Sequence, residues 1–227
     1  MAAHAVTLGK SAMSLPRENS SVASRSTRGS FKADDSAVSI NWNDLNYPPG
    51  IRLVHFDPDE LPTDVARLAR VLHWMFLLAF VELLINVTHT VVLVIGGMPA
   101  TRVGYAILDA VILAPSFGTT FYQGYVALVS SDDKTKRRYF FCQAICLIIS
   151  LFFAVSPLGA TNGLAALSSL HQRVRRYQLS KGMKAFWIYA VSLESTFWIT
   201  VFCLGVWGLA GVKRFNPFHS EAARNSA

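Results

Sequence analysis

Four long apolar stretches, separated by short polar links, constrain the fold of this chain most strongly. They cover residues 71–95, 103–129, 139–158 and about 185–212. Each reaches or exceeds the ~20 residues that an α-helix needs to cross ~30 Å of hydrocarbon at ~1.5 Å per residue. Open sheet edges would leave backbone groups unpaired in lipid, so helices are the form that such stretches adopt. The sequence therefore predicts an all-α membrane protein, a four-transmembrane-helix bundle.

The segments that flank the bundle differ in character. Residues 1–40 are rich in Ser, Ala and Arg with few large apolar side chains, which is typical of a disordered N-terminal tail. Residues 41–70 form a juxtamembrane strap in which aromatic residues alternate with prolines, and we expect the prolines to keep it extended. A helix that is N-capped by Thr63 or Asp64 should lead from the strap into the first span. Residues 213–227 form a short C-terminal tail.

Basic residues gather at the ends of the apolar stretches and give the chain a formal net charge of +7. Ten Lys and Arg lie on the side of the termini against six on the other side, which favours cytosolic termini. The side occupied by residues 159–184 stays open, and their basic run is compatible with an interfacial helix. No soluble domain carries this charge, so nucleic acid is not an expected partner. We expect anionic lipid head groups to contact the cations of the link between the second and third spans, which are Lys134, Lys136, Arg137 and Arg138.

Five polar side chains inside the predicted spans are candidates for a buried polar seam. Glu82, Asn86 and His89 share one face of the first helix at spacing i, i+4, i+7, while Asp109 lies in the second span and Glu194 in the fourth. Because a charge in the bilayer core costs about 2.5–3.5 kcal/mol, these groups must face protein or water. We favour a polar seam that fixes helix packing. The alternative is a proton or cation pathway, which would make the chain a small multipass transporter or channel.

Several short motifs occur in an order that is informative. They are Asn46-Tyr47-Pro48-Pro49 in the strap, Ala114-Pro115-Ser116-Phe117 in the second span, Tyr139-Phe140-Phe141 at the start of the third, and Gly163–Leu167 after it. Through these motifs, residues 46–214 resemble the secretory carrier membrane proteins. One departure is Gln123, which stands where the family usually has Arg.

The resemblance implies a four-span vesicle protein that acts in protein transport and membrane recycling, in endocytosis and exocytosis. It implies post-Golgi, trans-Golgi, endosomal or recycling membranes, or the plasma membrane. We expect no enzymatic activity, cofactor or metal, because the sequence carries no catalytic, phosphate-binding or metal-ligand pattern. A homo-oligomer is compatible with the same pattern.

One peptide motif, Asn216-Pro217-Phe218, follows the last span. Asn-Pro favours a turn that can present Phe218 as an anchor, and such tripeptides are ligands of EH domains in endocytic adaptors. The alternative is a chance tripeptide in which the proline merely ends the helix. The motif can recruit adaptors only if the tail is cytosolic.

Overall fold

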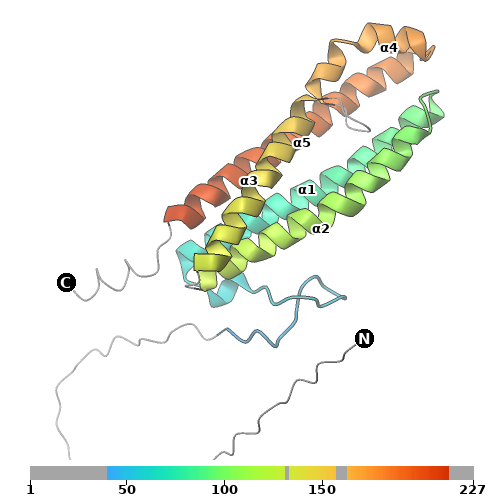
Figure 1. Cartoon of the computed structure of the whole chain (residues 1–227). Coiled ribbons are helices and arrows are strands. Elements are labelled where there is room, and N and C mark those ends of the chain that lie inside the picture. Colours follow the sequence, from blue (N-terminus) through green and yellow to red (C-terminus); the bar gives the residue numbers. More distant parts are fainter. Residues whose placement is uncertain (1–39, 131–132, 157–162, 215–227) are drawn as a thin grey trace, which may run out of the picture. The chain divides into compact units, whose positions relative to one another are not determined.

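The computed structural model describes residues 40–130, 133–156 and 163–214, and it places a long helix at each predicted span. The four helices are α1 (Thr63–Ile95), α2 (Thr101–Val129), α3 (Asp133–Val155) and α5 (Lys181–Arg214). Each is long and apolar enough to cross a membrane. They run side by side (Figure 1), so the predicted all-α fold with four spanning helices is confirmed. The tail predicted to be disordered lies, apart from Ile40, outside the described residues.

Two predictions are wrong in detail, one about the start of α1 and one about the strap. The helix begins at Thr63, so the N-cap is Pro62 and not Thr63 or Asp64, and the Ala66 N–H donates to the Pro62 carbonyl at 2.8 Å. The strap is not extended throughout, because Pro58–Glu60 form one turn of 3₁₀-helix, η1. Proline is tolerated at a first helical position, where its missing N–H would have no intrahelical partner.

The third helix includes the polar link that precedes it. It starts at Asp133, six residues before the predicted span, and ends at Val155, before the predicted end at residue 158. Lys and Arg are good helix formers, so the basic link continues the apolar helix into the head-group region. The cations of this link therefore stand on a helix and not on a loop.

Each long helix packs against two neighbours, in the order α1, α2, α3, α5 around the bundle. Glycines let α5 approach closely: a Cβ on Gly205 would lie 2.6 Å from Gln143 Nε2, and one on Gly208 would lie 2.5 Å from the Leu72 side chain. Small residues at such points allow helix backbones to come together in lipid, where no hydrophobic force drives helices to associate. The core of the bundle is correspondingly tight, with Trp198 and Tyr139 almost fully buried.

The bundle has two ends, which we call the strap end and the far end. At the strap end α1 and α3 begin and α2 and α5 finish; at the far end lie the opposite termini together with η2 (Leu164–Leu167) and α4 (Leu170–Arg176). Leu170 and Leu179 pack with Trp187 at the far end, and the Arg173 guanidinium lies 5.9 Å from the Trp187 ring centroid. The sequence of this basic segment is compatible with an interfacial helix, and the structure places a helix at Leu170–Arg176.

Candidate functional site

The strap folds back onto α1 and α2 through a small hairpin. Tyr47 and Val54 face each other and exchange two backbone hydrogen bonds, each 2.9 Å long. The Tyr47–Pro48 peptide bond is cis, and Gly50 takes a φ of 92°, which a glycine adopts without strain. This bridge closes the hairpin, residues 47–54, and within residues 41–62 the other regular secondary structure is the single turn η1.

An aromatic cluster holds the strap on the helices. Phe56 lies at its centre, with ring centroids 4.8 Å from His73, 5.0 Å from Phe121, 5.1 Å from Tyr125 and 5.6 Å from Tyr47. Each such aromatic pair contributes about 0.5–1.5 kcal/mol beyond the area it buries. The cluster joins strap, α1 and α2 into one packed unit.

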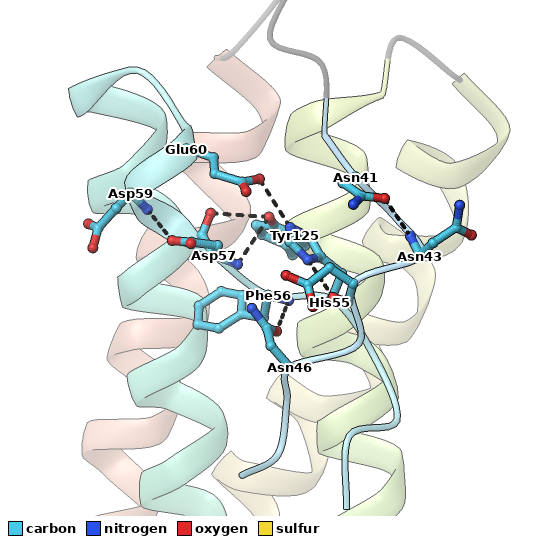
Figure 2. Close-up of polar contacts among 10 residues, drawn as sticks. Asn41, Asn43, Asn46, His55, Phe56, Asp57, Asp59, Glu60 and Tyr125 are labelled. Atoms are coloured by element: carbon cyan, nitrogen blue, oxygen red, sulfur yellow. Dashed lines mark hydrogen bonds and ion pairs between the residues drawn. The ribbon is translucent and has the colours of Figure 1, made fainter.

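Polar contacts fix the strap beside this cluster (Figure 2). The buried His55 ring places Nδ1 2.8 Å from the Asp44 carbonyl and Nε2 3.1 Å from Glu60 Oε2. The Tyr125 hydroxyl donates to the Asp57 carbonyl at 3.3 Å and accepts from the Asp57 N–H at 3.4 Å. The bonds of Tyr125 tie the strap to α2, and the bond of His55 with Glu60 ties the strap to its own turn η1.

The environment of His55 makes this attachment sensitive to pH. Burial lowers the pKa of His55, but the hydrogen bonds with the Asp44 carbonyl and the Glu60 carboxylate outweigh burial and raise the pKa above its usual value. A raised pKa in the docked state means that His55 contributes stability below its unfolded pKa of about 6.5. The contribution is lost as the pH rises through the higher, docked-state pKa.

Basic residues surround the strap end on three helices, and all of them are exposed except the half-buried Lys136. Along α5, Lys184 near the far end and Lys213 near the strap end are 29 residues apart. That is about 44 Å at the helical rise, against ~40–45 Å for a bilayer with its head groups. The two groups of cations thus match the two head-group regions. The basic residues at the strap end outside α3 are Arg67, Arg70, Lys213 and Arg214. The predicted lipid contact of the four cations on α3 stays a prediction; these are Lys134, Lys136, Arg137 and Arg138.

Three members of the predicted polar seam meet inside the bundle. Asn86 Nδ2 donates to Glu194 Oε2 at 3.0 Å, and His89 Nδ1 lies 2.8 Å from Glu194 Oε1. All three side chains are buried, so α1 and α5 are joined by polar contacts within the hydrocarbon region. This local pairing of Glu194 favours packing over a transport pathway.

The other two members behave differently. Glu82 is fully buried, and among the described residues neither of its carboxyl oxygens has a hydrogen-bond partner. Trp198 interacts with this carboxyl group, although the pair falls outside hydrogen-bond geometry. Asp109 is half-buried, and within the described parts of the chain no hydrogen bond joins it to the seam. The spacing on α1 placed Glu82 on the correct face, but in the described structure no hydrogen bond joins it to Glu194.

The Asn216-Pro217-Phe218 motif lies outside the described residues; α5 ends two residues before it, at Arg214. Conversely, sequence reasoning did not find the docking role of His55, Phe56 and Tyr125. The available signal was the i, i+4 pair Phe121 and Tyr125, which places two aromatic rings on one face of α2 opposite an aromatic strap.

Comparison with known proteins gives one family. The model of the SCAMP family matches residues 44–216, from the strap to just beyond α5. The match covers the hairpin, the aromatic cluster and all four long helices. No curated protein and no solved structure matches the chain.

Proposed function

We propose that this chain, which belongs to the SCAMP family, recruits cytosolic sorting adaptors to vesicle membranes through the segments at its strap end. Family membership and four apolar helices make it a multi-pass membrane protein of vesicle trafficking. Recruitment of adaptors, and the steps of endocytosis, exocytosis and recycling that it serves, are the finer part of the proposal. This work requires binding surfaces and no covalent chemistry.

One observation carries the proposal: three non-spanning segments emerge at the same end of the bundle. The strap leads into α1 at Thr63, α2 ends at Val129 and α3 begins at Asp133, and α5 ends at Arg214. A partner on that side of the membrane meets all three segments together. Several weak contacts on one protein gain affinity through their high effective concentration.

The charge pattern supports a cytosolic strap end. Eight Lys and Arg stand there on α1, α3 and α5, while the far end carries six, on α2, α4 and α5. Excess basic residues next to spans favour the cytosolic side. Tags at the N-terminus, at residue 134 and at residue 178 test this orientation: the first two should be accessible from the cytosol and the third should not. Cytosolic access at residue 178 alone would reverse the proposed orientation.

The adaptor contact that we propose is Phe218 in the pocket of an EH domain. A peptide of residues 213–227 should capture EH-domain adaptors, and Phe218→Ala should abolish capture because the anchor is lost. Phe215→Ala is the matched control, since it removes a phenylalanine outside the tripeptide. Equal capture by the Phe218→Ala peptide would remove the motif from the proposal.

A further inference from the structure

An apolar groove separates the strap hairpin from the helices behind it. Its volume is about 750 Å³, within the ~300–1,000 Å³ that small-molecule sites occupy. The hairpin wall includes Ile51 and Leu53, and the helix wall includes Leu77 and Phe80 of α1 and Ala114 of α2. No charged side chain lines it, and the hydroxyl groups present are those of two tyrosines and one threonine.

The helix wall of this groove lies at the depth of the hydrocarbon. Phe76 and Phe80 follow Arg70 along α1 by six and ten residues, which is about 9 and 15 Å below that cation at the helical rise. Arg70 belongs to the basic group at the strap end, and half of the hydrocarbon core is about 15 Å thick. The hairpin wall lies nearer the head groups, because the exposed Arg52 stands between Ile51 (67% exposed) and Leu53 (65% exposed).

We infer that this groove binds one acyl chain of a membrane phospholipid. The face of α1 supplies the geometry: Arg70, Leu77 and Phe80 are spaced i, i+7, i+10 and so lie on one side of the helix. A linear amphiphile whose phosphate meets Arg70 therefore runs its chain past Leu77 and Phe80. Arg52, exposed on the hairpin, offers a second cation on the opposite wall.

Two further observations suit a hydrocarbon chain. Small residues, Ala114 and Gly118, form part of the helix wall, and an added Cβ on Gly118 would already lie 3.3 Å from the Phe76 ring. Arg70 is paired with Asp59 at 2.5 Å, but both side chains are at least half exposed. Exposed ion pairs contribute little, so a lipid phosphate can compete for Arg70.

The test uses the full-length protein in phosphatidylcholine nanodiscs with a trace of phosphatidylcholine that carries a photoreactive group in mid-chain. After irradiation, labelled residues are mapped by mass spectrometry. Thr119→Phe and Ala114→Phe place a ring in the groove; Thr119 is exposed, so its variant should fold normally. Val111→Phe is the control, on α2 and 64% exposed but outside the groove.

We expect the label to concentrate on residues 48–54 and 76–80. It should fall about tenfold in Thr119→Phe and Ala114→Phe, because an apolar pocket discriminates at least about tenfold against a poor fit, and stay unchanged in Val111→Phe. Uniform labelling of all four helices, or an equal loss in the control, would overturn the assignment. Displacement of the label by cholesterol but not by unlabelled phosphatidylcholine would assign the groove to a sterol instead. Crosslinks between two protein chains at these residues would assign it to a second copy.

Discussion

Replacing Phe56 by alanine should release the strap while leaving the four-helix bundle folded. Truncating a buried phenylalanine costs about 3–5 kcal/mol. Phe56 is half-buried, but it also loses four aromatic contacts. We therefore expect the docked strap to lose about 2 kcal/mol, which is roughly a 30-fold increase in the population of the released strap.

Hydrogen exchange of the full-length protein in nanodiscs measures this change directly. The backbone N–H groups of Tyr47 and Val54 are paired in the hairpin, and exchange at residues 46–57 should become about 30-fold faster in Phe56→Ala. Amides within α1, α2, α3 and α5 should keep their protection, because the strap is a small unit packed on the outside of the bundle. Phe141→Ala is the matched control: Phe141 is 69% exposed on α3 and far from the strap in sequence. Unchanged strap protection in Phe56→Ala would refute the view that aromatic packing holds the strap.

Three further predictions concern the seam, the strap and the basic end. Glu194→Ala removes an acceptor of both Asn86 and His89, so it should lower the free energy of unfolding by about 1–3 kcal/mol. Glu82→Gln breaks no hydrogen bond in the described structure, so it should lower that free energy by clearly less. Thermal unfolding in detergent compares the two variants, and equal losses would contradict this assignment of contacts. Hydrogen exchange of the strap amides, corrected for intrinsic rates, should become faster as the pH rises from about 6 to about 8, because His55 loses its proton. His55→Gln should remove this dependence on pH. Anionic nanodiscs should stabilise the protein against heat more than zwitterionic nanodiscs do, by about 1 kcal/mol for each basic residue that contacts the lipid. Replacing Lys134, Lys136, Arg137 and Arg138 by Gln should abolish this difference, and full retention of it would show that these residues do not contact the lipid surface.

The helices were predictable because length and apolarity decide them almost alone. Each predicted span lies within or nearly within an observed helix, and the differences fall at charged ends such as Asp133–Arg138, where hydropathy drops but helix propensity does not. The seam was predictable in part, since the spacing of Asn86 and His89 fixes their common face. Nothing in the spacing shows how α5 is rotated, so the choice of Glu194 over Glu82 as their partner needed the packed bundle.

The docked strap could not be predicted for a different reason. Its contacts join residues far apart in sequence, such as Asp57 and Tyr125, across a segment with no periodic pattern. Prolines and aromatic residues indicated an ordered segment but not the surface that it covers. The cis peptide bond at Tyr47–Pro48 and the positive φ of Arg52 set the hairpin's path, and neither follows from residue type alone.

The length of α5 between its terminal cations bears on which membranes suit this protein. Between Lys184 and Lys213 the helix carries no basic residue, and the span between those two side chains exceeds the hydrocarbon thickness of every common bilayer. A bilayer of about 27 Å, as in the endoplasmic reticulum, obliges such a helix to lean further than one of about 32–33 Å, as in the plasma membrane. Thickness by itself therefore makes a thicker bilayer the better match for α5, because the helix crosses it with less tilt.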